Sequence, residues 1–333
     1  MAVFTEVSHA EAAPLFEALG LGALTELRGI EGGIENTNYF AATEQEGRTR
    51  LWVLTLFERL THAQLPFYLH LMKHLAGQGI PAPEPQARPA ALLCGPQDDA
   101  LLHTLAGKPA AVVSRLHGKS ELAPGPAHCA ALGAVLARAH LAGRGFELSQ
   151  PNLRALPWWN ETAPVVLPYL DAGQAALLRA ELAYQNHCAA TPAYAALPRG
   201  PVHADVFRDN VMFEGPPEQP TLTGLFDFYF AGIDTWLFDL AVALNDWAVD
   251  PGSGQGDPAR TQALLDAYQS VRPLNGAERR MLPAMARAGA LRFWISRLWD
   301  FHLPRKAALL TPHDPAHFER VLRARVQQPL RAP

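Results

Sequence analysis

The most informative segment for the fold and chemistry of this chain is Val202-His-Ala-Asp-Val-Phe-Arg-Asp-Asn-Val-Met-Phe213. It contains Asp205 and, after four further residues, Asn210, and a second apolar stretch downstream ends at Asp227. An aspartate able to accept a hydroxyl proton therefore precedes an asparagine and an aspartate able to hold a magnesium ion. A phosphoryl-transfer site needs these groups, because its catalysis consists of positioning and charge neutralisation.

A β-hairpin is predicted to follow this segment. The apolar stretches 210–213 and 221–227 flank Glu-Gly-Pro-Pro-Glu-Gln-Pro, whose composition is typical of a turn. If the strands pair antiparallel about a midpoint near Pro217–Glu218, Asn210 and Asp227 face each other at the open end. An amide oxygen beside a carboxylate suits magnesium, which prefers oxygen ligands and keeps some of its waters. The alternative is that both residues only cap turns.

A metal-dependent hydrolase is the weaker interpretation of the same residues. His203 and Asp205 carry side chains that ligate metals, and histidine is the commonest transition-metal ligand. The sequence has no second His-Asp cluster with ligand spacing. We therefore expect His203 to orient the loop by hydrogen bonding.

Composition excludes several classes of protein. The 333 residues are enough for two lobes, and 49% apolar with 18% charged residues is ordinary globular composition. The net charge of -4 and the lack of a basic run argue against nucleic-acid binding. No signal peptide and no apolar run of ~18 residues, the length of a membrane span, are found. Three widely spaced cysteines form no zinc or Cys-x-x-Cys pattern, which favours a reduced, cytoplasmic compartment (Cys94, Cys129 and Cys188).

The first third of the chain mixes strand and helix signals, and the remainder reads mostly as helices. Strands are expected at 26–40 (around a glycine-containing turn), 50–57 and 110–116, with a helix at 65–76; later helices are expected at 132–143, 172–190, 238–247, 259–271, 283–301 and 315–325. We predict an α+β fold with a strand-rich N-lobe of residues 1–116 and a larger helical C-lobe of residues 117–333. The N-lobe would cover a nucleotide bound between the lobes, and the C-lobe would hold the catalytic loop, hairpin and substrate helices.

The pattern His203-x-Asp205-x4-Asn210 with Asp227 resembles that of the aminoglycoside phosphotransferase and choline kinase superfamily, which implies a bilobal, protein-kinase-like fold. Longer stretches, from residue 4 to the C-terminal helix, resemble more narrowly the homoserine kinases of that superfamily: 28–40, 53–58, 224–229 and 238–247. The resemblance implies phosphorylation of L-homoserine, with ATP and Mg2+, in threonine biosynthesis. From charge and hydropathy we expect no nucleic-acid or membrane partner, and the sequence gives no oligomeric state.

The resemblance also implies roles for individual residues. Asp205 would accept the hydroxyl proton or orient the hydroxyl, and Asn210 and Asp227 would hold magnesium. Backbone N–H groups of the loop 29–38 would cover the phosphates. Further nucleotide contacts are implied for that loop and for an adenine hinge after the last N-lobe strand (Gly32, Gly33, Asn36, Asn38, Ser114 and Leu116).

Three groups in the C-lobe have two interpretations each. Arg208 would clamp the substrate carboxylate or the transferring phosphoryl group, or form a salt bridge with Asp209 or a neighbouring acid. Asp239 would brace the catalytic loop or cap the next helix. The run 245–247 would face the substrate ammonium or form a solvated helix end. The aromatic stretch 292–299 is interpreted as core.

The N-lobe departs from the usual kinase pattern, which pairs a strand lysine with a helix glutamate. Thr55 stands where the lysine is expected, and the helix 65–76 contains no acid. The cation that neutralises the α- and β-phosphates is left open among four candidates (Arg28, Arg59, Lys73 and Arg115). Protein kinases have a glycine two residues after the metal-binding aspartate, and this chain has Tyr229 there, which favours a small-molecule kinase.

Two other functions compete with homoserine phosphorylation. A kinase for choline, an aminoglycoside or another small alcohol would share the mechanism, although the mixed charges of the C-lobe do not suggest a polycationic substrate. A nucleotide-binding pseudokinase module would explain the missing lysine, but the intact set of Asp205, Asn210 and Asp227 argues against it.

Overall fold

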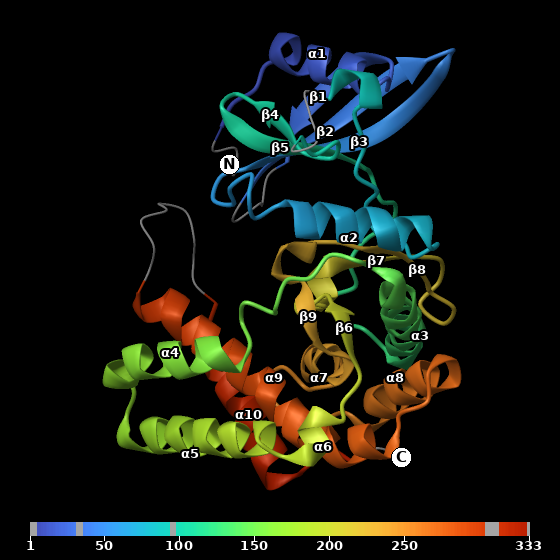
Figure 1. Cartoon of the computed structure of the whole chain (residues 1–333). Coiled ribbons are helices and arrows are strands. Elements are labelled where there is room, and N and C mark those ends of the chain that lie inside the picture. Colours follow the sequence, from blue (N-terminus) through green and yellow to red (C-terminus); the bar gives the residue numbers. More distant parts are fainter. Residues whose placement is uncertain (1–4, 31–35, 94–97, 304–312, 332–333) are drawn as a thin grey trace. The chain divides into compact units, whose positions relative to one another are not determined.

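The computed structural model describes the chain except for residues 1–4, 31–35, 94–97, 304–312 and 332–333 (Figure 1). The chain folds into two compact units, an N-terminal unit of residues 1–117 and a C-terminal unit of residues 118–333. This division falls one residue beyond the predicted boundary, and the roles assigned to the two lobes remain predictions.

The N-terminal unit is built on a five-stranded antiparallel sheet in the order β1-β2-β3-β5-β4. Its strands are β1 (Ala23–Gly29), β2 (Asn36–Gln45), β3 (Arg48–Phe57), β4 (His103–Leu105) and β5 (Lys108–Ser114); its helices are α1 (His9–Ala18), α2 (Pro66–Gly77) and the 3-10 turn η1 (Ala90–Leu92). The three predicted strand regions and the helix α2 are confirmed. The helix α1 and the short strand β4 were not predicted.

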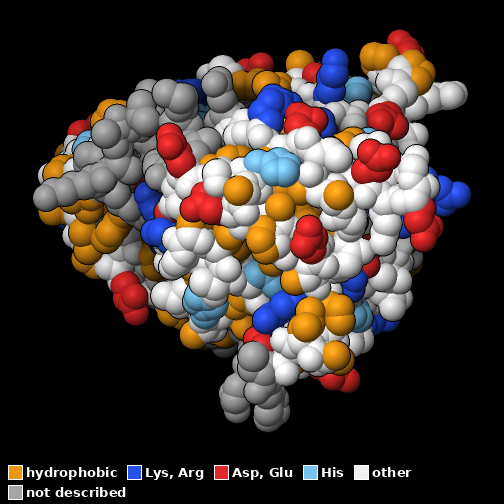
Figure 2. Space-filling model, turned by 90° about the horizontal axis from the view of Figure 1, so that it is seen from above, with side chains coloured by type: hydrophobic (Ala, Val, Ile, Leu, Met, Phe, Trp, Pro, Cys, Tyr) orange, Lys and Arg blue, Asp and Glu red, His pale blue; other side chains and the backbone are white. Residues whose placement is uncertain are grey.

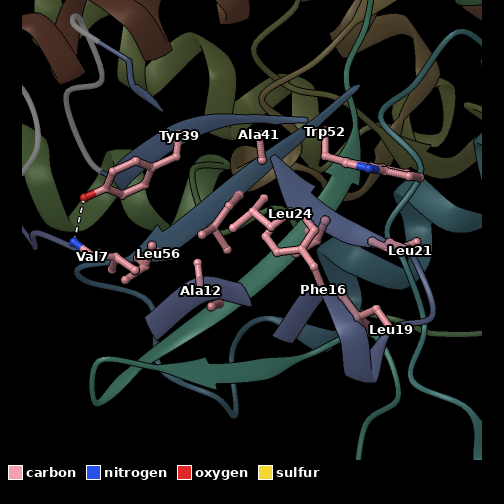
Figure 3. Packing of buried hydrophobic residues seen from close by; sticks show 13 residues of the cluster. Val7, Ala12, Phe16, Leu19, Leu21, Leu24, Tyr39, Ala41, Trp52 and Leu56 are labelled. Atoms are coloured by element: carbon pink, nitrogen blue, oxygen red, sulfur yellow. Dashed lines mark hydrogen bonds between the residues drawn. The ribbon is translucent and has the colours of Figure 1, made fainter. Parts of the chain in front are cut away.

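The helix α1 packs against the sheet and closes an apolar core. Phe16 of α1 and Leu54 and Leu56 of β3 are fully buried in it (Figure 3). At one edge of this core the Tyr39 hydroxyl accepts the Val7 N–H (2.9 Å), which fixes the chain before the helix (Figure 3). Burial of several large apolar side chains, each worth about 1.5–3 kcal/mol, stabilises this unit.

The C-terminal unit is mostly helical and carries two small antiparallel sheets, β6 with β9 and β7 with β8. Its helices are α3 (Pro126–Ala142), α4 (Leu156–Val166), α5 (Ala172–Ala189), α6 (Pro192–Ala195), α7 (Trp236–Trp247), α8 (Pro258–Val271), α9 (Gly276–His302) and α10 (Ala316–Gln327), with 3-10 turns η2 (Gly143–Gly145), η3 (Leu167–Tyr169), η4 (Arg208–Asn210) and η5 (Phe228–Phe230); its strands are β6 (Arg199–Val202), β7 (Val211–Glu214), β8 (Thr221–Leu225) and β9 (Gly232–Thr235). The long helix α9 packs against α7, α10, α4 and α5 (Figure 1). All predicted helices of this unit are present, and α4, α6, β6 and β9 were not predicted.

The helix α9 begins at Gly276, well before the predicted start at Pro283. Asn275 and Glu278 form a capping box, in which each side chain accepts the backbone N–H of the other residue (both 2.9 Å). Proline lacks an N–H and usually marks a helix start, which is why Pro283 misled the prediction.

Replacing Gly133 by alanine tests the contact between α3 and α8. A Cβ atom at Gly133 would lie 2.3 Å from the Leu264 carbonyl oxygen of α8, so the two helices must separate. We expect a loss of about 1–3 kcal/mol in the free energy of unfolding, although alanine is the better helix former. Urea unfolding measures it. Gly252→Ala in an exposed loop is the matched control and should cost less than about 0.5 kcal/mol. Equal effects of both changes would contradict the packing described.

Candidate active site

The candidate catalytic loop, residues 203–210, connects β6 to β7. Pairing of β6 with β9 fixes the start of the loop, and the 3-10 turn η4 ends it. The backbone of Ala204 is left-handed (φ 63°), a conformation that costs a non-glycine residue about 1–3 kcal/mol. Such a conformation persists only where the surrounding structure holds it in place.

The carboxylate of Asp239 holds this turn. It accepts the N–H groups of His203 (2.8 Å) and Ala204 (2.7 Å) from its position on α7. The helix cap of α7 is Thr235, so the capping interpretation of Asp239 is wrong and the bracing interpretation is confirmed. Burial opposes ionisation of Asp239, but the hydrogen bond from His140 (3.2 Å) and those from the loop keep its pKa below the usual range. Asp239 is therefore an ionised, fully buried anchor.

His203 orients the loop by hydrogen bonding, as predicted. Its Nδ1 accepts the Asp205 N–H (3.3 Å), and its Nε2 therefore carries the proton that is donated to the Phe226 carbonyl (2.9 Å). Both ring nitrogens are engaged, which leaves no lone pair for a metal. Among the residues that the structure describes, no group of three His, Cys, Asp or Glu side chains could hold a metal ion.

Asp205 and Asn210 are joined at the two ends of the loop. The Asn210 amide nitrogen donates to the Asp205 carbonyl (2.9 Å) and to its carboxylate oxygen Oδ2 (3.2 Å). Burial raises the pKa of Asp205, while the positive charges of Arg292 and Arg297 and the nearby His203 act in the opposite direction. A carboxylate with a raised pKa is the stronger base.

The hairpin is centred where predicted, but its register at the open end differs. Glu214 pairs with Thr221, whereas Val211 pairs with Leu225, because Thr223 is an extra residue in β8. The Phe226 N–H consequently donates to the Asn210 carbonyl (3.0 Å), and Asp227 is the next residue. The prediction that Asn210 and Asp227 face each other directly was therefore wrong by one position. A bulge of this kind cannot be read from strand lengths.

Asp227 adopts a left-handed backbone (φ 65°, ψ 58°) between β8 and the 3-10 turn η5. Aspartate tolerates this conformation better than most residues. It directly follows the residue that is hydrogen-bonded to Asn210, so the end of the hairpin brings both predicted magnesium ligands to the same region.

Arg208 forms the salt bridge that was the alternative to a substrate clamp. Its partner is Asp246 rather than Asp209, with Nε 3.1 Å from the Asp246 carboxylate. The remaining guanidinium nitrogens donate to the carbonyl groups of Leu122 (2.9 Å) and Asp246. The side chain thus ties the loop to α7, and a direct catalytic role of Arg208 stays a prediction.

The run 245–247 is not a solvated helix end. Asn245 and Trp247 are fully buried. The Asn245 amide donates to the Ala286 carbonyl (2.7 Å) and accepts from Arg325 Nε (2.9 Å), and the Trp247 indole donates to the Val206 carbonyl (2.8 Å). The interpretation as a solvated helix end is therefore wrong for Asn245 and Trp247, because tertiary partners far away in sequence bury them. The interpretation that the run faces the substrate ammonium stays a prediction.

The predicted nucleotide residues lie at two places in the N-terminal unit. Asn36 and Asn38 lie at the start of β2, and Gly32 and Gly33 lie outside the described residues. The other place is the end of β5, where the Ser114 hydroxyl accepts the Glu84 N–H (2.8 Å) and Leu116 follows, half-buried.

Thr55 is buried on β3, directly opposite Asn38 on β2. Its hydroxyl donates to the Asn38 amide oxygen (2.7 Å), so this strand position is filled by a neutral hydrogen bond. Among the candidate cations, Lys73 is ion-paired with Glu84 (2.6 Å), and Arg115 lies over the Phe40 ring (4.1 Å). Which cation meets the phosphates stays open.

Comparison with known proteins identifies the family. The model of the phosphotransferase enzyme family matches residues 26–274, a span that includes the catalytic loop and hairpin. The chain belongs to the phosphotransferase enzyme family. It is 61% identical over 332 residues to the homoserine kinase of Polaromonas naphthalenivorans, with 99% of each chain covered. It is 57% identical to the homoserine kinase of Cupriavidus necator, with 98% of this chain and 96% of that one covered.

A solved structure of amicoumacin kinase in complex with AMP-PNP, Ca2+ and Ami has a similar fold, with a TM-score of 0.62 at 16% identity. The likeness covers 91% of this chain and 89% of that chain. The predicted α+β, kinase-like fold is thereby confirmed.

Sequence reasoning missed one charged residue of the site. The stretch 292–299 is core, as predicted, and Phe293, Trp294, Ile295 and Leu298 are buried. Arg292 is buried with them and interacts electrostatically with Asp205. An arginine inside an apolar helical run was the signal that could have identified it.

Asp239→Asn tests the anchor of the loop. An amide cannot replace both acceptor oxygens, so one buried N–H loses its partner and the unfolding free energy should fall by about 2–3 kcal/mol. Phosphotransferase activity should fall as well, because Ala204 is no longer held. Urea unfolding and an ATP-consumption assay measure the two effects. Asp266→Asn, an exposed aspartate of α8, should change neither; equal stability of both variants would refute the anchoring role.

Asp205→Asn separates activity from stability. Activity should drop at least about 100-fold, because an amide accepts no proton. The raised pKa of Asp205 means that its ionisation destabilises the folded state as pH rises through that pKa. The variant should therefore melt at the parent's temperature or above it at pH 7, and its advantage should vanish at acidic pH.

The raised pKa of Asp205 also affects the pH dependence of the parent enzyme. As pH falls, its activity should decline at a pH above about 3.9, the pKa of an ordinary aspartate. Glu214→Gln, an exposed carboxylate on β7, is the control for both measurements. A marked loss of stability in Asp205→Asn at neutral pH would contradict this electrostatic description.

Proposed function

We propose that this chain is a homoserine kinase, which transfers the γ-phosphoryl group of ATP to L-homoserine and forms ADP and O-phospho-L-homoserine. The observation that carries the proposal is the braced loop with Asp205 and Asn210 joined by a hydrogen bond. Identity of 61% to a homoserine kinase over 332 residues supports the choice of substrate. We assign the reaction to threonine biosynthesis.

Asp205 orients the homoserine hydroxyl and accepts its proton as the oxygen attacks the γ-phosphorus of ATP. The bond from the γ-phosphorus to the bridging oxygen breaks, and ADP leaves with that electron pair. The burial that raises the pKa of Asp205 strengthens it as a base. Asp239 and Asn210 keep the carboxylate in place, so little reorganisation is needed during the transfer.

The donor set of Asn210 and Asp227 fits magnesium. The amide nitrogen of Asn210 donates to Asp205, which leaves the amide oxygen for a cation. Asp227 adds a carboxylate from the adjoining end of the hairpin. When bound there, magnesium would neutralise charge on the phosphate oxygens of ATP.

Contacts with ATP are proposed for the N-terminal unit. Asn36, Asn38 and the preceding glycine-containing stretch would cover the phosphates, and the residues from Ser114 to Leu116 would meet the adenine. The Asn38 amide oxygen already accepts from Thr55, and its amide nitrogen donates one hydrogen to the Asn36 carbonyl (3.5 Å), so the second amide hydrogen is the donor that would face the nucleotide.

The surface and the cysteines of the chain bear on its partners and its cellular location. Basic and acidic side chains are interspersed on the face seen in Figure 2, which does not favour a nucleic-acid partner. No helix in the described part of the chain is long and apolar enough to cross a membrane. We propose a cytoplasmic location, where thiols such as those of Cys129 and Cys188, both buried and unpaired, remain reduced.

An acceptor assay tests the proposal against its competitors. Homoserine should be turned over with far higher kcat/KM than choline, an aminoglycoside or ethanolamine. Robust turnover of another alcohol without turnover of homoserine would replace the proposed substrate. A parent protein that consumes ATP with none of these alcohols would instead favour the pseudokinase.

Removal of the metal tests the magnesium ligands. Excess EDTA should abolish turnover, and added Mg2+ should restore it. Asn210→Ala should raise the Mg2+ concentration needed for half-maximal activity at least about 10-fold, because one ligand is lost. Titration of Mg2+ in the kinase assay measures this, with Glu214→Gln as the control. An unchanged Mg2+ requirement in Asn210→Ala would remove Asn210 from the site.

A further inference from the structure

Arg292 is a buried charge without the partners that such a group normally has. It lies on α9 among apolar side chains, and only 3% of it is exposed. Its Nε and Nη2 atoms find no hydrogen-bond partner among the described residues. Buried polar atoms in folded proteins are nearly always hydrogen-bonded, so an orphaned pair of donors calls for an explanation.

Aromatic contacts account for only part of this charge. The guanidinium carbon lies 3.8 Å from the ring centre of Phe293 and 5.3 Å from that of Phe230. Cation–π contacts are worth about 0.5–2 kcal/mol, and they leave the in-plane N–H donors unused. Burial lowers the pKa of Arg292 to about 9, so the side chain still carries its charge at neutral pH.

The charges around Arg292 connect it to the catalytic loop. Asp205 interacts favourably with Arg292 and also with Arg297 on the same helix. No hydrogen bond or ion pair within 4.0 Å joins Arg292 to Asp205 in the part of the chain that the structure describes. The guanidinium therefore lies in the field of the catalytic carboxylate without being neutralised by direct contact.

The two orphaned donors have a geometry that suits a ligand with two adjacent anionic oxygens. Nε and Nη2 form one edge of the guanidinium, with N–H bonds that run parallel. This edge matches the two oxygens of a carboxylate, which arginine binds in a bidentate manner. A phosphate oxygen pair would fit the same edge.

We propose that Arg292 binds the α-carboxylate of the acceptor while Asp205 holds its hydroxyl group. This inference rests on the proposed function, because homoserine carries both groups, separated by two methylene groups and the α carbon. Arg297 adds a second positive charge that favours an anionic acceptor. The site would thus select amino-acid alcohols over alcohols that lack a carboxylate.

Two acceptors and two variants test this role. The acceptors are L-homoserine and 3-amino-1-propanol, which is the same amino alcohol without the carboxylate. Arg292→Met removes the charge and the paired donors, and Arg292→Lys keeps the charge but not the paired donors. Arg280→Met, an exposed arginine of the same helix, is the control. Each variant is first compared with the parent by circular dichroism.

We expect the ratio of kcat/KM for homoserine to that for 3-amino-1-propanol to fall at least about 100-fold in Arg292→Met. The fall should be smaller in Arg292→Lys and absent in Arg280→Met. The KM for ATP should not change in any of them. If Arg292→Met does not fold, Arg292→Lys gives the same comparison, because a lysine cannot form the bidentate contact.

Two results would overturn the inference while leaving homoserine kinase activity in place. One is an unchanged acceptor ratio in folded Arg292 variants. The other is an equal loss for both acceptors with a raised KM for ATP, which would assign Arg292 to a nucleotide phosphate. A parent protein that does not phosphorylate homoserine would instead overturn the proposed function, and the inference with it.

Discussion

The candidate site depends on the carboxylate of Asp239. It accepts two consecutive N–H groups, from His203 and Ala204, and so holds a turn whose backbone would otherwise be unfavourable. His140 donates to the same carboxylate and keeps it ionised in a fully buried place. Asp205 directly follows these two residues, so the start of its loop is held by two hydrogen bonds. Positioning of this kind is the main contribution that a protein makes to phosphoryl transfer.

The local order of residues predicted much of the site. The spacing of Asp205, Asn210 and Asp227 predicted a phosphotransferase, and the family match confirms that class, while the roles of the three residues stay proposals. The turn composition placed the hairpin correctly. The predicted pairing register of the two strands was wrong, because Thr223 is an extra residue in β8. Side-chain patterns do not reveal such a bulge in the backbone. The bracing role of Asp239 was anticipated only through family resemblance, since its partners lie 35 and 36 residues away.

Buried polar residues were the hardest to predict. Asn245 looked like a helix end exposed to solvent, and its partners Ala286 and Arg325 are visible only in the folded chain. Arg292 looked like one member of an aromatic core, and its orphaned donors likewise appear only in the structure. Two helix starts, by contrast, could have been predicted from the sequence and were missed. Ser8 with Glu11 and Asn275 with Glu278 both have the spacing of a capping box.

The most direct test of this account is a crystal structure with a non-hydrolysable ATP analogue, Mg2+ and L-homoserine bound. We predict the homoserine hydroxyl on the Asp205 carboxylate, the α-carboxylate on Arg292, and the metal ion on Asn210 and Asp227. Homoserine bound with its hydroxyl away from Asp205, or a metal ion held without Asn210 and Asp227, would contradict the account.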